Sequence, residues 1–513
     1  MSVRVRFAPS PTGMLHVGAL RDALFKYLYA RHEGGVNILR IEDTDRTRFV
    51  ANSEDEFVES LNWVGIDFQE GPHVGGPFGP YRQSERKEAG IYDKWIQELM
   101  KLGHAYKAFD TTEELDEMRE FQQINKQQVG YYGGIWRDAT PEQVAAAEVE
   151  GKPYVIRQRI PRGQTIVIED LIRGRIEWDS DTVDDPVLIK ADGMPTYHFA
   201  AMVDDHLMEI THIIRGEEWI SSAPKHACLF DAFGWPRPVF VHCPVIKGKD
   251  GKKLSKRHGA TRVLDYRAEG YLPEALINFV ALIGWAPGGD RELMDKDELV
   301  GAFSLDGLQP SPGVFDIEKL RWMNGNYIRA TGLDELFNAL MVYAENPETD
   351  SYWETYEPEG DIKIDAPAIR SALQTLVKAA VADPLYAKAA VGLEQERVTT
   401  FADFGPATEF FFLDEPPMDE KAIEKWFRLD HVRELFTTLI AEFEDQQDAS
   451  VEECEKYVRW YAESKEFEKL GPIVHPMRVA LTGKTFGPGL FELMSLLGPQ
   501  RMVARLRRAL TYL

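Results

Sequence analysis

Residues 3–41 limit the possible folds more than any other part of this chain. Strand-like segments at 3–8 and 36–41 enclose a helical pattern of about 14 residues, in which apolar side chains recur at helical spacing. A strand, a helix and a second strand in this order predict a β-α-β unit, whose two strands are parallel. This part of the chain therefore predicts an α/β domain built on a parallel sheet.

The loop between the first strand and the helix is suited to binding an anion. In FAPSPTGMLHVGALRDALF (7–25), Pro9 and Pro11 end the strand, and the helix begins near His16 and Gly18. Backbone N–H groups and a helix N-terminus then converge on one point, which favours a phosphate. Gly18 lets a flat ring approach the backbone, and His16 can donate to a phosphate oxygen. An ordinary capped turn is the alternative for this loop taken alone.

Further along the chain the pattern changes twice. From residue 106, short helical and strand patterns alternate, and apolar strands typical of a parallel sheet return at 185–219 and 238–246. After residue 264, helical patterns dominate, at 265–284, 292–302, 316–330, 333–345, 366–381, 420–446, 450–466, 474–482 and 490–512. We therefore predict a Rossmann-type α/β domain with a parallel sheet, split by an α+β insertion and followed by an all-α C-terminal half.

The composition is that of a globular protein of several domains. Its 513 residues, 44% hydrophobic and 28% charged, are too many for one core, and we expect about three to five domains. No apolar run approaches the ~18–20 residues that span a membrane, and we expect no secretory signal. Three cysteines are too few for a disulfide framework, which favours a reducing, cytoplasmic setting.

The charge is strongly acidic overall but basic in places. The net charge of −25 argues against nucleic acid over the whole surface. Residues 246–262 nevertheless hold five Lys, two Arg and one Asp, and 501–508 add four Arg. Acidic residues concentrate elsewhere, as in 346–365, which we expect to be a linker or surface excursion. A polyanion can bind locally under these conditions, and the alternative is an acidic protein with one solvated basic loop.

The basic segment contains a second candidate phosphate site. KLSKR (253–257) is flanked by glycines, which favour a mobile loop. On such a loop, Lys256 can move onto a phosphate and neutralise charge as it develops. A solvated loop is again the alternative when the motif is taken alone.

In this order, the two motifs resemble the paired signature of class I aminoacyl-tRNA synthetases. PSPTGMLHVGA stands where that class has His-Ile-Gly-His, and KLSKR where it has Lys-Met-Ser-Lys-Ser. The resemblance to bacterial-type glutamyl-tRNA synthetases covers most of the chain, in RFAPSPTG, RIEDTDR (40–46), EGP…GPYRQSER (70–86), DGMPTYHFAAMVDDHLM (192–208), IIRGEEW (213–219) and VFDIEKLRWMNGNYI (314–328).

The resemblance implies ATP-dependent ligation of L-glutamate to the 3′ end of tRNA(Glu) through a glutamyl-adenylate, with release of AMP and pyrophosphate. Attack of a carboxylate on the α-phosphate needs positioning and charge stabilisation and no side-chain nucleophile. The implied catalytic residues are His16, Gly18 and Lys256, and Mg²⁺ is expected to accompany ATP. The residues implied for ATP binding are His16, Gly18, Glu218, Trp219, Ile246, Lys253 and Lys256.

Glutamate carries two carboxylates and one ammonium, so its site needs cations and an anion. Arginine binds carboxylates in a bidentate manner, so we expect Arg6 and Arg215 to bind the carboxylates, with Arg215 on the γ-carboxylate, and Glu42 to bind the ammonium. As alternatives, Arg6 could simply pair with Glu42, and Arg215 could form a surface network with Glu217 or Glu218. The resemblance implies a glutamate site of Arg6, Ala8, Ser10, Glu42, Tyr197, His198 and Arg215.

Some positions depart from the family pattern. Ala19 replaces the second histidine of the class motif, and Ala201 stands where many members have Asn, so we expect no side-chain contact to glutamate from position 201. The inserted segment has no Cys for the zinc knuckle of some relatives, and we predict no protein-bound zinc. His226, Cys228, His242 and Cys243 are the other candidate metal ligands, and core packing is the preferred interpretation for them. A structural charge cluster is the preferred interpretation of Asp43, Asp45, Arg46 and Arg48.

The resemblance also implies how the chain is divided for binding tRNA. Arg397 matches an arginine that checks the third anticodon base. The expected parts are the two halves of the Rossmann-type catalytic domain at 1–85 and 175–220, an inserted acceptor-end domain at 86–174, a stem-contact domain with the KLSKR loop at 221–332, and a helical anticodon-binding region at 333–513 that can divide near 420.

Helices rather than β-barrels in the C-terminal half favour a glutamyl over a glutaminyl enzyme. Two alternatives stay open, namely a relative that also charges tRNA(Gln) and a non-catalytic tRNA-binding paralogue. We expect a monomer because one chain would hold every required site.

Overall fold

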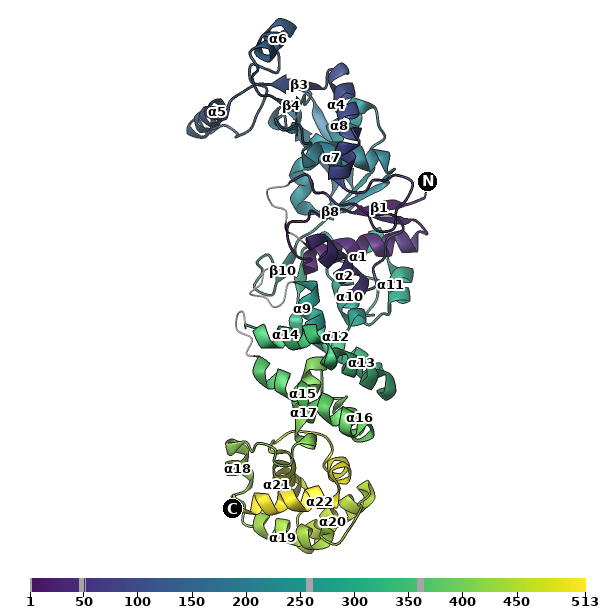
Figure 1. Ribbon diagram of the computed structural model, residues 1–513, viewed down its shortest axis with the longest axis vertical. Helices are drawn as coiled ribbons and strands as arrows, with labels where there is room; N and C mark the ends of the chain where they lie inside the picture. The colour runs from purple at the N-terminus through teal and green to yellow at the C-terminus, as the bar shows by residue number, and fades with distance from the viewer. Residues whose placement is uncertain (1, 46–49, 51, 255–261, 358–363) are drawn as a thin grey trace. The chain divides into compact units, whose positions relative to one another are not determined.

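The structure is a computed structural model that describes residues 2–45, 50, 52–254, 262–357 and 364–513. The chain forms two compact units. Unit 1 comprises Met1–Val263 and Ile277–Asp316, and unit 2 comprises Leu264–Leu276 and Ile317–Leu513. All the described strands belong to unit 1, and every described element from α12 onward is a helix (Figure 1).

The first elements form the expected β-α-β unit. Strands β1 (Arg4–Phe7) and β2 (Val36–Leu39) are parallel neighbours, and α1 (Val17–His32) connects them. The sequence-based prediction for this region is therefore confirmed. The carboxyl end of β1 leads directly into the Pro-rich loop, which places that loop at the edge of the sheet where ligands bind in such folds.

A four-stranded sheet continues unit 1, with the order β6-β5-β9-β8. Strands β8 and β9 are parallel, and the Thr211 N–H, just before β8, donates to the carbonyl oxygen of Arg4 at 3.0 Å. This hydrogen bond places the start of β8 beside β1. The strands are β5 (Thr165–Asp170), β6 (Gly174–Asp179), β8 (His212–Gly216) and β9 (Val239–Cys243).

A separate three-stranded antiparallel sheet, in the order β3-β4-β7, carries the helices α5 and α6 (Figure 1). Strand β5 falls within the expected insertion at 86–174, but it pairs with β9 of the larger sheet. Ile166 and Ile168 of β5 are buried in the same core as Phe240 of β9. The elements are β3 (Ala105–Ala108), β4 (Val155–Gln158), β7 (Val187–Ile189), α5 (Thr112–Ile124) and α6 (Pro141–Val149).

The basic segment begins with the short strand β10 (Ile246–Gly248), which pairs in parallel with β11 (Gly313–Phe315). Helix α10 (Pro273–Ala281) contains residues of both units. The remaining helices of unit 1 are α2 (Ser53–Trp63), α3 (Gln83–Glu88), α4 (Ile91–Lys101), α7 (Tyr197–Leu207), α8 (Ala223–Phe233) and α11 (Lys296–Ala302), with short 3₁₀ turns at Ser180–Thr182, Glu217–Ser222 and Leu305–Gly307.

Unit 2 has two hydrophobic cores, which Figure 1 draws as two groups of helices. The first group contains α9 (Val263–Ala268), α12 (Ile317–Ala330), α13 (Leu333–Glu345), α14 (Pro347–Thr355), α15 (Ala366–Ala382), α16 (Pro384–Glu394) and α17 (Phe401–Phe412). The second contains α18 (Glu420–Trp426), α19 (Val432–Phe443), α20 (Val451–Ser464), α21 (Gly471–Thr482) and α22 (Leu490–Leu510).

Three features of unit 2 differ from the sequence-based expectation. Residues 347–355 form helix α14 and not a linker, because Trp353 is buried in the first core and its indole N–H donates to Tyr343 Oη at 3.2 Å. Helices α16 and α17 were not predicted. The expected helix at 420–446 is two helices, α18 and α19.

None of the described helices is both long and apolar enough to cross a membrane.

Candidate active site

A cavity of about 750 Å³ surrounds the start of α1 in unit 1. His16 is the N-cap of this helix, and its Nδ1 accepts a hydrogen bond from the Ala19 N–H at 3.2 Å. In the neutral ring the proton is therefore on Nε2, which can donate to a ligand. The pKa of His16 is lowered, first because the surrounding protein displaces water and then because Lys253 adds positive charge. The histidine is thus a neutral donor near pH 7.

The two sequence motifs meet at this cavity. His16 forms a β-bridge with Arg262, and the Val263 N–H donates to the Leu15 carbonyl oxygen at 2.9 Å. Lys253 lines the same cavity as His16. Lys256 lies outside the described residues, so its predicted role stays a prediction.

The other residues expected to bind ATP also line this cavity. Gly18, Glu218, Trp219 and Ile246 are all part of its wall. A Cβ atom at Gly18 would lie 3.1 Å from the His16 ring, so a larger side chain there would push the imidazole away. Because glycine has no side chain, Gly18 leaves room for the His16 ring in this position.

A second cavity of about 530 Å³ is lined by most of the residues expected to bind glutamate, namely Arg6, Ala8, Ser10, Glu42, Tyr197 and Arg215. His198 does not line it. Five residues line both cavities, so the two cavities adjoin, and these shared residues are Ala8, Ser10, Asp22, Arg215 and Trp219. The Trp219 ring lies against Tyr197, with 4.4 Å between the ring centroids.

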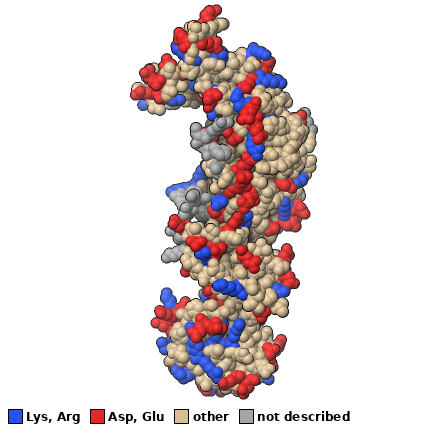
Figure 2. Space-filling model, in the orientation of Figure 1, with Lys and Arg blue, Asp and Glu red and all other residues tan. Residues whose placement is uncertain are grey.

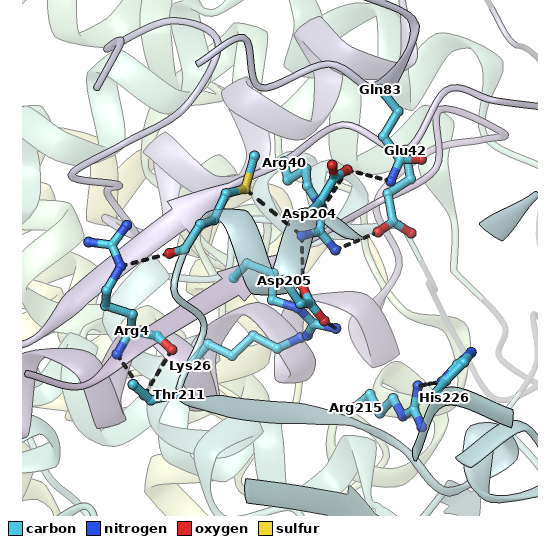
Figure 3. A network of polar contacts seen from close by, with 12 residues as sticks. Arg4, Lys26, Arg40, Glu42, Gln83, Asp204, Asp205, Thr211, Arg215 and His226 are labelled. Carbon is cyan, nitrogen blue, oxygen red and sulfur yellow. Dashed lines mark hydrogen bonds and ion pairs between the residues drawn. The ribbon is translucent and has the colours of Figure 1, made fainter. Parts of the chain in front are cut away.

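A buried ion network supports the second cavity (Figure 3). Asp205 accepts from Arg6 Nε and Nη2 at 2.9 and 3.2 Å and from Arg40 Nη1 at 2.7 Å. Arg40 Nη2 donates to Glu42 at 2.9 Å. Arg6 and Glu42 are therefore linked through Asp205 and Arg40, and the alternative of a simple Arg6–Glu42 pair does not describe the network.

Glu42 has an unusual environment for a carboxylate. Burial raises its pKa, and the nearby Arg40 and Arg6 oppose this rise without cancelling it. A substrate ammonium placed beside Glu42 would supply a further positive charge and favour the ionised carboxylate.

Arg215 is buried between two histidines. Its Nε donates to His242 Nε2 at 3.0 Å. Its Nη1 donates to His226 Nδ1 at 3.0 Å, the contact that Figure 3 shows. Among the described residues, its Nη2 is buried and has no hydrogen-bond partner. The alternative of a surface network with Glu217 or Glu218 is wrong, because Arg215 is buried and donates to the two histidines. Glu217 instead accepts from Arg173 and from the Val245 N–H. Arg215 is therefore a buried arginine that lines both cavities and is held by two histidines.

A family model described as "tRNA synthetases class I (E and Q), catalytic domain" matches residues 2–322. The chain belongs to this family. A model for an anticodon binding domain matches residues 366–510. The chain is 39% identical over 510 residues to a glutamate–tRNA ligase of Geobacillus stearothermophilus, covering 99% of this chain and 98% of that protein. It is 40% identical over 520 residues to one from Moorella thermoacetica, with the same coverage.

Solved structures of the family show the same similarity. A crystal structure of a glutamate tRNA ligase from Elizabethkingia meningosepticum in complex with its amino acid matches with a TM-score of 0.85 at 36% identity. The match covers 100% of this chain and 99% of that one. A glutamate–tRNA synthetase from Elizabethkingia anophelis matches with a TM-score of 0.82 at 35% identity, covering both chains fully.

In this class I synthetase, two departures from the family motifs have a structural explanation. The backbone N–H of Ala19 holds His16, a contact that needs no side chain at position 19. Ala201 is fully buried in α7 and lines neither described cavity.

The candidate metal ligands and the charge cluster also have defined places. His226 and His242 are buried around Arg215, and Cys228 and Cys243 are buried thiols. Within the described part of the chain, no group of three or more His, Cys, Asp or Glu is arranged to hold a metal ion. Asp43 accepts from the Ser84 N–H and hydroxyl, as a structural residue would. Asp45 lines the second cavity, whereas Arg46 and Arg48 lie outside the described residues.

Several residues at the two cavities were not predicted from the sequence. Asp205 and Arg40 form the ion network, and Asp22 lines both cavities while holding the buried ammonium of Lys26. The two aspartates of the quoted segment MVDD were a signal, because adjacent acidic residues in an apolar helix need buried cationic partners.

Arg397 is exposed just after α16, in unit 2, where its Nη1 donates to the Leu393 carbonyl oxygen at 2.9 Å. The neighbouring Glu394 is buried, and burial raises its pKa to about 7 against the opposing charges of Arg397, Lys484 and Arg478. On the face drawn in Figure 2, Lys and Arg side chains gather on the C-terminal helices.

Proposed function

We propose that this chain is an ATP-dependent ligase that joins L-glutamate to the 3′ end of tRNA(Glu) through a glutamyl-adenylate and releases AMP and pyrophosphate. The observation that carries the proposal is the pair of adjoining cavities in unit 1. One is lined by the residues of both phosphate motifs and the other by several cationic side chains, and Arg215 lines both. The family membership of the whole chain agrees with it.

The chemistry follows from holding two substrates in line. The α-carboxylate of glutamate attacks the α-phosphorus of ATP, a new carboxyl–phosphate bond forms, and pyrophosphate leaves with the electrons of the broken bond. His16 donates from Nε2 to a phosphate oxygen, and the N-terminus of α1 stabilises the negative charge. Lys253 and Lys256 neutralise the departing pyrophosphate. Mg²⁺ bound to the phosphates would supply further charge stabilisation.

The arrangement favours one assignment of the two glutamate carboxylates. Arg215 lines both cavities, so it lies where the reacting α-carboxylate must meet ATP, whereas Arg6 lines only the second cavity. We therefore assign the α-carboxylate to Arg215 and the γ-carboxylate to Arg6, which reverses the sequence-based expectation. Glu42 binds the ammonium. Ala8, Ser10 and Tyr197 complete the wall, and His198 acts from behind it.

The remaining parts of the chain bind tRNA in this proposal. The insertion at 86–174 holds the acceptor end, 221–332 contacts the inner corner of the tRNA, and 333–513 binds the anticodon, with Arg397 at its third base. Support for the last assignment comes from the anticodon binding model over residues 366–510 and from the exposure of Arg397. The enzyme acts as a cytoplasmic monomer.

The test is charging of separate tRNA(Glu) and tRNA(Gln) transcripts with radiolabelled glutamate, ATP and Mg²⁺. We expect charging of tRNA(Glu) alone, and we expect Arg397→Ala to raise charging of tRNA(Gln) relative to tRNA(Glu). Charging of both by the wild type would identify a non-discriminating enzyme and remove the role of Arg397. Charging of neither would overturn the proposed activity in favour of a non-catalytic paralogue.

A further inference from the structure

The groups that hold Arg215 are unusual for a buried arginine. Buried guanidinium groups in this chain commonly face carboxylates, as Arg6, Arg40 and Arg86 do with Asp205 and Asp204. Arg215 instead donates to two imidazoles, those of His226 and His242, both fully buried. Its positive charge is therefore held in place without an adjacent negative charge.

Each imidazole is fixed in one tautomer by its second partner. Because arginine can only donate, His242 Nε2 and His226 Nδ1 must both be unprotonated acceptors. The proton of His242 is then on Nδ1, which donates to Asp170 Oδ2 at 2.6 Å. The proton of His226 is on Nε2, which donates to His198 Nδ1 at 3.0 Å. The result is a continuous chain from Asp170 through Arg215 to His198.

The ends of this chain are anchored in different elements. Asp170, at the end of β5, also accepts from the backbone N–H groups of His242, Ile172 and Arg173, so its carboxylate is fully engaged. His198 is in α7 and His226 is in α8. Strand and helix residues of unit 1 thus converge on the guanidinium of Arg215. His198 does not line the cavity and reaches Arg215 through His226.

The electrostatic surroundings keep both histidines neutral. Burial lowers the pKa of His226 strongly, and the positive charge of Arg215 lowers it further. Burial also lowers the pKa of His242, although Asp170 opposes this. For His198, burial and then Lys225 lower the pKa to about 4.

We propose that His226 and His242 are positioning residues that clamp Arg215 with uncharged acceptors, so that its full positive charge remains available to the substrate carboxylate. A carboxylate in either position would orient the guanidinium equally well but would compete with the substrate for its charge. The inference rests on the proposed function, since it names the groups that keep the carboxylate site cationic.

Position 226 offers an isosteric test. The side-chain oxygen of Asn or Asp can occupy the place of His226 Nδ1, so His226→Asn supplies a neutral acceptor and His226→Asp a charged one of the same size. Glutamate- and ATP-dependent pyrophosphate exchange is measured in the presence of tRNA(Glu). We expect the KM for glutamate to be about 10-fold or more higher in His226→Asp than in His226→Asn, corresponding to about 1.4 kcal/mol, with a smaller change for ATP.

The matched control is the pair His206→Asn and His206→Asp. His206 is in the neighbouring helix α7 of the same unit, but it stacks on Trp235 and does not contact Arg215. The two control variants should have the same KM for glutamate. Equal KM values for the two His226 variants, with an active wild type, would overturn the clamp alone. An inactive wild type would instead overturn the proposed function.

A second measurement does not depend on activity or on the folding of a variant. Nitrogen-15 NMR of histidine-labelled wild-type protein distinguishes the two neutral tautomers from the imidazolium. We expect a neutral ring protonated at Nε2 for His226 and at Nδ1 for His242 at pH 7. An imidazolium at either position, or the opposite tautomer, would contradict the proposal.

Discussion

Replacement of Asp205 by Asn tests the buried ion network directly. The carboxylate is fully buried and accepts three hydrogen bonds from two guanidinium groups, Arg6 and Arg40, which are 4% and 0% exposed. Asn keeps the shape and one acceptor oxygen but removes the charge. Removing one partner of a buried ion pair costs about 3–5 kcal/mol. Arg40 keeps Glu42, so we expect about 3 kcal/mol for this variant.

Hydrogen exchange followed by mass spectrometry gives the local free energy of opening for the β1 and α7 peptides. About 3 kcal/mol corresponds to roughly 100-fold faster exchange in these peptides. The control is Asp231→Asn, because Asp231 also binds an arginine, Arg237, with both of its oxygens but is about half exposed. A surface pair of this kind contributes about 0–1 kcal/mol. Equal exchange rates in the two variants would refute the importance of burial.

The pH dependence of the same network gives an independent check. Burial raises the pKa of Asp205, but the charges of Arg6 and Arg40 outweigh it, so the net pKa is lowered. The carboxylate therefore stabilises the fold above its unfolded-state pKa, and this contribution is lost as the pH falls through the lower folded-state pKa. The difference in exchange between wild type and Asp205→Asn should shrink on acidification. A difference that grows instead would contradict the sign.

Three further predictions concern single features. Gly18→Val should displace the His16 ring and raise the KM for ATP about 10-fold or more. Gly301→Val in α11, where a Cβ meets open space, should leave this KM unchanged, and equal KM values for the two variants would refute the steric argument. Burial raises the pKa of Glu42, so this carboxylate begins to lose its charge at a pH above 4.5. The KM for glutamate should therefore rise as the pH falls towards 4.5, and a KM that stays constant down to pH 4.5 would contradict the raised pKa. Trp353→Ala should lower the free energy of unfolding of unit 2 by about 3–5 kcal/mol in urea, because the indole ring fills part of a core. A loss below about 1 kcal/mol would contradict the burial of this ring.

The sequence predicted those parts of the fold that depend on local patterns. Prolines after a strand and a helix with apolar spacing were enough for the β-α-β unit, and the helical half followed from the same periodicity. Helix α14 was missed because its sequence is acidic and contains proline. What makes it a helix of the core is the burial of Trp353, a tertiary contact that outweighs composition.

The site was predicted where a motif gives the residue and was missed where partners are distant. Arg6 was found, but its partner Asp205 is 199 positions away along the chain. His226 and His242 were interpreted as core residues, and they are buried. Their function as acceptors for Arg215 depends on pairing between β8 and β9 and on the position of α8, which no local pattern encodes.

The order in which the chain visits its two units has a consequence for protein synthesis. Strand β10, which leads into the KLSKR segment, is paired with β11, and residues 264–276 of unit 2 are made between these two strands. At ~5–20 residues per second, a ribosome completes β11 about 3–13 s after β10. The nascent chain therefore contains the first motif, in residues 7–25, long before β10, which leads into the KLSKR segment, can pair with β11. A fragment that stops before Gly313 therefore lacks the strand that pairs with β10, and not only the helices that follow.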